Sequence, residues 1–179
     1  MTTASKITVL RVLMVPVFMI VLLSDIPYAN YIALAIFIVA SVTDFVDGYI
    51  ARHYNQVTDF GKFMDPLADK LLVFAALLIF VQNGLMPAWA AMVILTREFA
   101  VTGLRLIAVG KDRVIAAGMS GKVKTFSSMV CICVMLTDVG LIRLGPIDLN
   151  WICVAVMVVT TVWSGVEYFV KNYDVLDLA

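Results

Sequence analysis

Six long apolar runs, separated by short polar or helix-breaking segments, account for almost the whole chain. About 20 consecutive apolar residues suffice for an α-helix to cross the hydrocarbon core of a bilayer. The pattern therefore predicts an all-α integral membrane protein, a bundle of six transmembrane helices. We place them at roughly residues 7–24, 29–53, 61–82, 87–110, 117–138 and 150–171. No linker or change of composition marks a boundary, so we expect one transmembrane catalytic domain over residues 1–179.

The composition agrees with a membrane location. Hydrophobic residues make up 63% of the chain and charged residues 15%, whereas about 25% of a soluble domain is charged. The net charge is zero, which gives no reason to expect a nucleic-acid partner. The three cysteines, Cys131, Cys133 and Cys153, lie inside apolar runs without metal-binding spacing. We interpret them as packing residues.

The basic residues are distributed very unevenly between the two ends of the predicted helices. Loops on the cytoplasmic side of a membrane carry an excess of Lys and Arg. An inside N-terminus puts most of them at that side, namely Lys6, Arg11, Arg52, Lys62, Lys70, Arg105, Lys111, Arg113, Lys122, Lys124 and Lys171. Only Arg143 then lies on the opposite side, and Arg97 lies deeper. We expect a multi-pass protein of the cytoplasmic membrane with both termini facing the cytoplasm.

Four aspartates form the strongest chemical signal. Asp44 and Asp47 are three positions apart, Asp65 and Asp69 four, and each spacing places a pair on one helical face. Two neighbouring helices would bring four carboxylates to one pocket at the cytoplasmic end. Such like charges need a cation, and oxygen ligands suit Mg²⁺, Mn²⁺ or Ca²⁺ better than zinc. The only histidine, His53, is interpreted as a surface residue.

Small residues accompany these aspartates. Gly48, Ala51 and Gly61 leave room for a ligand to approach the backbone, although small residues also let membrane helices pack closely. Arg52 is suited to bidentate binding of a phosphate. It is equally suited to a role as a positive-inside anchor.

The full pattern is Asp44-x2-Asp47-Gly48-x2-Ala51-Arg52-x8-Gly61-x3-Asp65-x3-Asp69. It resembles the signature of the CDP-alcohol phosphotransferase family at every fixed position, and the six-helix layout is similar too. The resemblance implies a homodimeric membrane enzyme that uses a CDP-linked lipid. The four aspartates would hold two divalent cations, Mg²⁺ or Mn²⁺, and Asp69 would be the general base. The implied nucleotide site consists of Thr8, Asp47, Gly48, Ala51, Arg52 and Gly61.

Three further stretches resemble the glycerol-phosphate branch of that family: ITVLRVLMVP, TREFAVTGLRLIAVG and GKVKT. The resemblance implies that CDP-diacylglycerol is the donor, glycerol 3-phosphate the acceptor, and CMP the leaving group. Thr8 and Arg11 share one helical face, as in that branch. Ser5 stands where the branch has asparagine, which weakens the prediction of a nucleotide contact at that position.

An acceptor with its own phosphate needs cations near the aspartates. Arg105, Lys122 and Lys124 lie at the cytoplasmic ends of their predicted helices, and Arg11 is a further candidate. The alternative is ordinary positive-inside charge. Arg97, next to Glu98, falls about 15 Å deep at 1.5 Å per residue. A buried ion pair, a dimer contact and ligand binding all remain open for it.

Two alternative functions also fit the pattern. A relative with another acceptor, such as inositol phosphate, phosphatidylglycerol or serine, would have the same aspartates. A divalent-cation transporter is a different class, and intramembrane aspartates are typical of it. However, the acidic residues lie at one end of the helices and no inverted repeat is visible.

Overall fold

The structure is a computed structural model. It describes the backbone of residues 3–53, 59–111, 113, 115–116, 118–144 and 147–175. The side chains of residues 3–8, 44–53, 59–69, 138 and 143–144 are outside that description.

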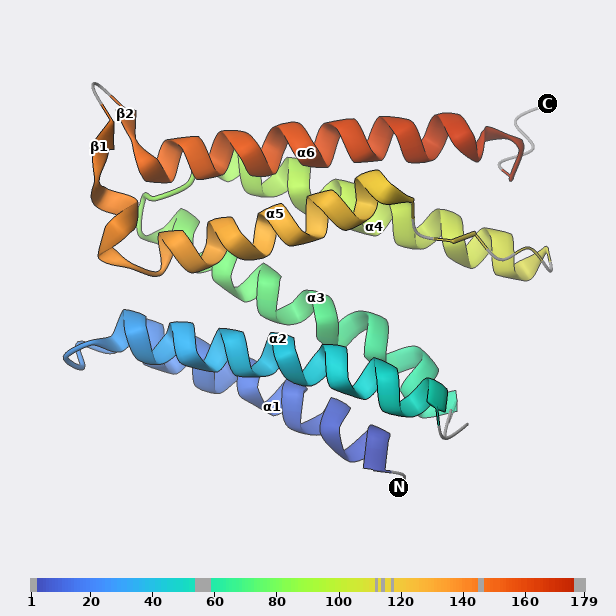
Figure 1. Ribbon diagram of the computed structural model, residues 1–179, viewed down its shortest axis with the longest axis horizontal. Helices are drawn as coiled ribbons and strands as arrows, with labels where there is room; N and C mark the ends of the chain where they lie inside the picture. The colour runs from blue at the N-terminus through green and yellow to red at the C-terminus, as the bar shows by residue number, and fades with distance from the viewer. Residues whose placement is uncertain are drawn as a thin grey trace. The chain divides into compact units, whose positions relative to one another are not determined.

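The described chain is almost entirely helical (Figure 1). Its six α-helices are α1 (Thr3–Leu22), α2 (Ala29–His53), α3 (Asp59–Gln82), α4 (Ala88–Gly110), α5 (Met119–Met135) and α6 (Leu149–Lys171). The prediction of six helices in an all-α protein is confirmed, with ends that differ by up to four residues. The C-terminal end that differs most from the prediction is that of α5, which ends three residues early. The Thr137 hydroxyl donates to the Val134 carbonyl there, and the chain turns.

The membrane crossings themselves stay a prediction. Within the described part of the chain, α6 is the one helix whose length and apolar character suit a crossing. Three further apolar segments there are shorter: Val9–Leu22, Ala29–Thr43 and Lys70–Gln82.

The chain divides into two compact units. Unit 1 is Met1–Asn83 and contains α1, α2 and α3. Helix α1 packs against both α2 and α3, and α2 also contacts α3. The rings of Phe18 and Phe37 meet in the core of unit 1, with centroids 6.2 Å apart. Ala33 and Ala40 are fully buried one turn to either side of Phe37, so small residues let α1 and α2 approach closely.

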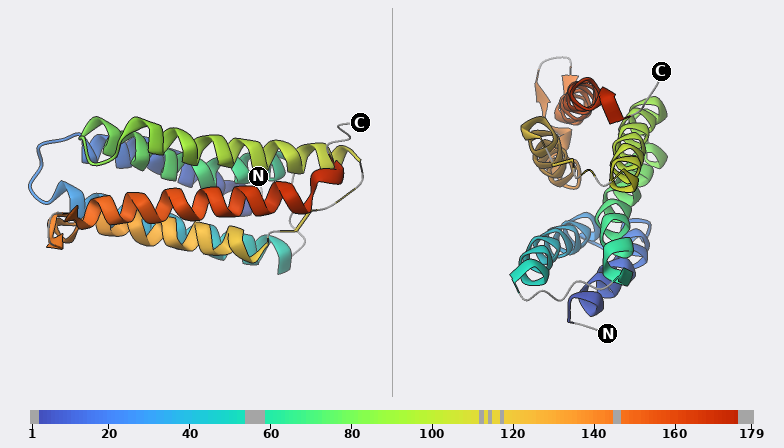
Figure 2. Two further views of the ribbon diagram at one scale, coloured as in Figure 1. Left: turned by 90° about the horizontal axis from the view of Figure 1, so that it is seen from above. Right: turned by 90° about the vertical axis from the view of Figure 1, so that its right-hand side faces the viewer.

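Unit 2 is Gly84–Ala179 and contains α4, α5 and α6. Helix α6 packs against α5 along its length and also against α4 (Figure 2). A 3₁₀ turn η1 (Asp138–Leu141) and a two-stranded antiparallel hairpin, β1 (Arg143–Leu144) and β2 (Ile147–Asp148), connect α5 to α6. A second 3₁₀ turn, η2 (Tyr173–Val175), follows α6, and Val175 is buried with Leu104, Ala108 and Tyr168.

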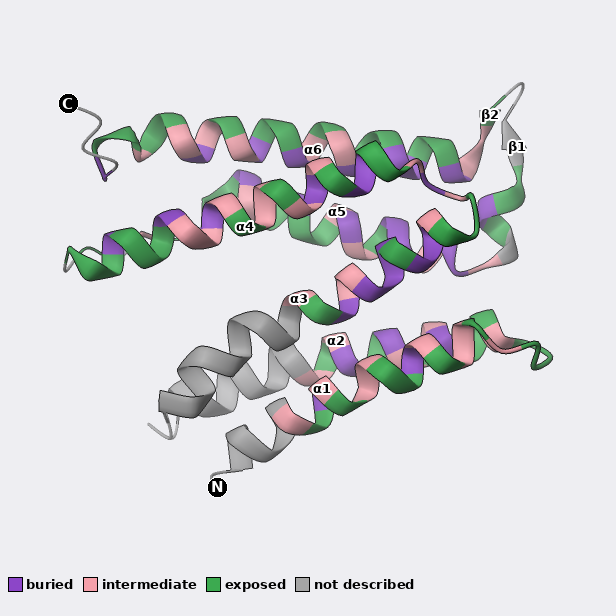
Figure 3. Cartoon of the chain, turned by 180° about the vertical axis from the view of Figure 1, so that it is seen from behind, coloured by how far each residue is buried: buried purple, intermediate pink, exposed green. Residues whose placement is uncertain are grey.

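Both units expose many residues (Figure 3), and a large share of them carry large apolar side chains. Leu13 and Ile20 of α1, Met92 of α4, Phe126 of α5 and Val159 of α6 are all more than half exposed. Extensive exposed apolar surface is rare in soluble monomers and marks contact with lipid or protein.

Candidate functional site

The backbone places the four aspartates in two helices of unit 1. Asp44 and Asp47 belong to α2, and Asp65 and Asp69 belong to α3. The helical spacing assumed for each pair is therefore confirmed. The direction of the four side chains lies outside the described residues, so their convergence stays a prediction.

The depth of these positions in the two helices matches. Helix α2 ends at His53 and α3 begins at Asp59, and the two run in opposite directions (Figure 1). At about 1.5 Å per residue, Asp47 lies about 9 Å before the end of α2, and Asp65 lies about 9 Å after the start of α3. Asp44 and Asp69 lie one turn further in, at about 14–15 Å. The backbone thus brings the four positions to similar levels of a contacting helix pair.

The same two helices carry most of the predicted nucleotide site. Gly48, Ala51 and Arg52 lie in α2 and Gly61 in α3, with side-chain environments outside the described residues, as is that of Thr8 in α1. Four carboxylates form an all-oxygen donor set, which fits Mg²⁺ or Mn²⁺ by its chemistry. Among the side chains that the structure describes, no group of three or more acidic, His or Cys residues forms another candidate metal site.

Arg11 is a buried cation of unit 1. It lies in α1, the helix that packs against both aspartate-bearing helices, and it is 3% exposed. A guanidinium remains protonated even when buried. Arg11 thus brings a guanidinium group into the interior of unit 1.

Unit 2 contains a buried cluster of three charged side chains, Arg97, Glu98 and Lys124. The Lys124 ammonium donates to Glu98 Oε1 over 2.6 Å, and Arg97 Nη1 donates to the same oxygen over 2.9 Å. The side chains are 12%, 13% and 5% exposed in chain order. Two cations therefore share one carboxylate oxygen inside the helical packing.

Two glycines make room for the Arg97 side chain. A Cβ atom at Gly165 of α6 would lie 3.2 Å from Arg97 Cγ, and one at Gly121 of α5 would lie 3.8 Å from Nη2. Within the described structure, Arg97 Nε is buried without a hydrogen-bond partner. The sequence left three roles open for Arg97. The structure establishes the buried ion pair, and Nε of Arg97 remains as a further donor.

The other predicted acceptor-phosphate residues have different surroundings. Arg105 Nε donates to the hydroxyl of Tyr168 over 3.0 Å, and its guanidinium lies 5.5 Å from the centroid of that ring. Lys122 is exposed in the first turn of α5. The structure thus joins Lys124 to Arg97 and Glu98, while Arg105 is held against α6.

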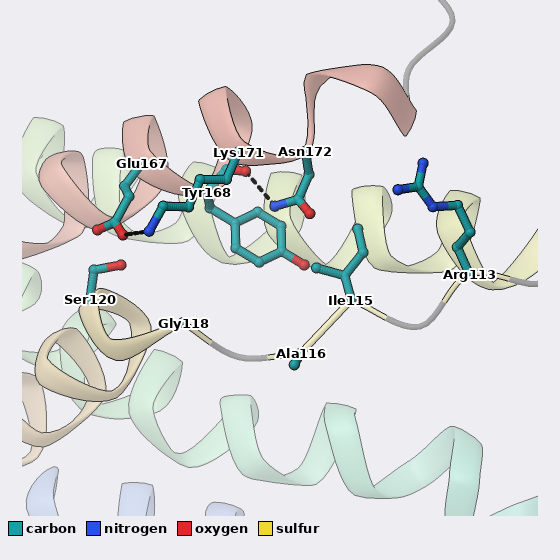
Figure 4. Close-up of a pocket in the computed structure, with 9 residues that line it drawn as sticks. All are labelled: Arg113, Ile115, Ala116, Gly118, Ser120, Glu167, Tyr168, Lys171 and Asn172. Atoms are coloured by element: carbon teal, nitrogen blue, oxygen red, sulfur yellow. Dashed lines mark hydrogen bonds and ion pairs between the residues drawn. The ribbon is translucent and has the colours of Figure 1, made fainter.

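A cavity of about 280 Å³ lies at the end of unit 2 where α6 finishes and α5 begins (Figure 4). Lys171 pairs with Glu167 along α6, and Ser120 lines the same cavity. On the other side, Arg113 donates to Asp174 over 2.6 Å. That hydrogen bond holds the pKa of the Asp174 carboxyl below its ordinary value.

Nearby, Lys111 donates to the carbonyl of Val175 over 3.0 Å. The segment after α4 is therefore tied to the turn after α6 at two points, by Arg113 and Lys111.

Comparison with known proteins places these features in one family. The sequence model of CDP-alcohol phosphatidyltransferases matches residues 1–163. A Bacillus subtilis protein named CDP-diacylglycerol--glycerol-3-phosphate 3-phosphatidyltransferase is 46% identical, over 96% of this chain and 95% of its own. A Mycobacterium tuberculosis protein named probable phosphatidylglycerophosphate synthase is 40% identical, over 94% and 80%. An Escherichia coli protein with the same name as the Bacillus relative is 33% identical, over 96% and 95%. With the signature aspartates on two adjacent helices and a family match over most of its length, the chain belongs to the CDP-alcohol phosphatidyltransferase family.

Proposed function

We propose that the protein transfers the phosphatidyl group of CDP-diacylglycerol to glycerol 3-phosphate, forming phosphatidylglycerophosphate and CMP. The observation that carries this proposal is the similarity, over more than nine tenths of the chain, to relatives named for this reaction. The acceptor-specific stretches of α1, α4 and α5 also support glycerol 3-phosphate over other alcohols.

The reaction needs a base, a place for the nucleotide and a means of neutralising the diphosphate. Asp69 would accept the proton of a free hydroxyl of the acceptor. The hydroxyl oxygen then attacks the phosphorus that carries diacylglycerol, and the bond from that phosphorus to the CMP oxygen breaks. Residues around Asp47 and Gly48 in α2, with Thr8 of α1 and Gly61 of α3, would bind and orient the CDP group.

Two divalent cations, Mg²⁺ or Mn²⁺, would be held by Asp44, Asp47, Asp65 and Asp69. When bound, they supply positive charge at the diphosphate and fix its orientation. The matched depth of the four positions in α2 and α3 supports this assignment. Carboxylate oxygens are the ligands that these hard cations prefer.

The phosphate of the acceptor is proposed to bind to cations of α4 and α5. Lys124, Lys122 and Arg105 are the residues expected from the sequence, and the buried cluster adds Arg97. The buried Nε–H of Arg97 supports this assignment, because a phosphate oxygen can accept a hydrogen bond from it. Arg11, in unit 1, is a separate candidate for the same role.

The enzyme is proposed to work as a single transmembrane domain of the cytoplasmic membrane. All six helices would cross the bilayer, with both termini and the aspartates on the cytoplasmic side. The exposed apolar side chains support lipid contact. The family resemblance also leads us to propose a homodimer.

An acceptor panel tests this function. Purified protein in CDP-diacylglycerol liposomes would be offered glycerol 3-phosphate, phosphatidylglycerol, inositol phosphate or serine, and both lipid product and CMP would be measured. Of the four acceptors, we expect only glycerol 3-phosphate to give a lipid product, and only when Mg²⁺ or Mn²⁺ is present. Product with a different acceptor would reassign the substrate. Uptake of Mg²⁺ into the liposomes without release of CMP would support a cation transporter instead.

A further inference from the structure

Two cysteines that are 22 positions apart in the sequence meet in the interior of unit 2. Cys131 lies in α5 and Cys153 in α6, and both are 6% exposed. The two thiols lie within interaction distance of each other.

The helix register supports this pairing. Cys131 is four residues before Met135, where α5 ends, and Cys153 is four residues after Leu149, where α6 begins. The short hairpin connection makes α5 and α6 antiparallel, so both positions lie about 6 Å from the same end of the pair. Helices α5 and α6 also pack extensively against each other.

The third cysteine provides an internal comparison. Cys133 also lies in α5, two positions after Cys131, and is only partly buried. Two positions correspond to about 200° around a helix. Cys133 therefore lies on nearly the opposite face of α5 from Cys131. Of these two α5 cysteines, only Cys131 is on the face that packs against α6.

We propose that Cys131 and Cys153 are a redox-active pair that closes to a disulfide between α5 and α6 on contact with a membrane-soluble disulfide oxidant. One thiol attacks the oxidant, forming a mixed disulfide and releasing one small thiol. The second cysteine then attacks the mixed disulfide, forming the Cys131–Cys153 bond and releasing a second small thiol. Both cysteine protons leave on these small thiols, so two cysteines are oxidised as one oxidant molecule is reduced.

The bond would close the loop that contains η1 and the β1–β2 hairpin. A cross-link of this kind stabilises a protein mainly by restricting its unfolded chain. The oxidised protein should therefore unfold at a higher temperature than the reduced protein. This inference does not depend on the proposed lipid chemistry, because it concerns thiols alone.

The test uses the full-length protein in detergent micelles with an aromatic disulfide as oxidant. Wild type and Cys133→Ser should each lose two hydrogens in intact mass without keeping an adduct, and a reductant should reverse the change. Proteolytic mapping should place the bond between Cys131 and Cys153, and the unfolding temperature should rise on oxidation. Cys153→Ser should form no internal bond and show no such rise.

Three results would overturn the proposal. The first is a bond that includes Cys133. The second is a stable aryl adduct on both Cys131 and Cys153 of the wild type. The third is that both thiols persist in the folded protein in micelles, although the same oxidant consumes them once a denaturing detergent has unfolded the protein.

Discussion

Replacing Glu98 by glutamine is the sharpest test of the buried charged cluster. The Lys124 and Arg97 nitrogens lie 2.6 and 2.9 Å from one Glu98 oxygen, so they are at most about 5.5 Å apart. Glutamine keeps the shape but removes the negative charge between them. At that distance two like charges repel by about 3 kcal/mol in an effective dielectric of about 20. Because all three side chains are at least 87% buried, solvent screens this repulsion weakly.

The expected loss of unfolding free energy for Glu98→Gln is therefore about 3–5 kcal/mol, the range found when one partner of a buried ion pair is removed. Lys124→Met is the matched control. It leaves the neutral pair of Arg97 and Glu98, so it should cost less, about 1–2 kcal/mol. The double variant should be more stable than Glu98→Gln alone, because it no longer contains the repulsion between the Lys124 ammonium and the Arg97 guanidinium.

Unfolding in mixed micelles, followed by far-UV circular dichroism, measures these differences. The ranking of the three variants is the decisive result. If Glu98→Gln were as stable as the wild type, or if Lys124→Met were the more damaging change, the cluster could not be the desolvated group that the structure describes.

Three further predictions concern the active site, a tight contact and a pH effect. Asp69→Asn should lower kcat by at least about 100-fold, as loss of a general base does, and chelation of metal should abolish CMP release until Mg²⁺ or Mn²⁺ is restored. Gly140→Ala should destabilise the protein by about 1–3 kcal/mol, since its Cβ would lie 2.2 Å from Asn150 Oδ1, whereas Gly103→Ala, which has no atom within 4 Å, should not. Asp174 has a lowered pKa in the folded protein, so its ion pair contributes fully at neutral pH and is lost as pH falls below about 4 through that lowered pKa. The stability difference between wild type and Asp174→Asn should therefore vanish in acid, and a difference independent of pH would contradict the assignment.

The sequence by itself determined the helices and the family. Apolar runs separated by breakers such as the segment before Ala88 are local features, and local features are enough to predict helices to within a few residues. The aspartate signature is also local, because it spans only Asp44 to Asp69 and depends on spacing within two consecutive helices. The direction of those four side chains stays a prediction.

The tertiary structure decided which side chains from distant segments meet. Arg97 and Lys124 come from different helices, yet both bind Glu98, in a space left by Gly165 of a third helix. Likewise, α6 brings Cys153 to Cys131 rather than to Cys133. Hydrophobic periodicity states that a helix has a buried face, but it does not state which helix covers that face. That choice depends on the packing of all three helices together, and only coordinates reveal it.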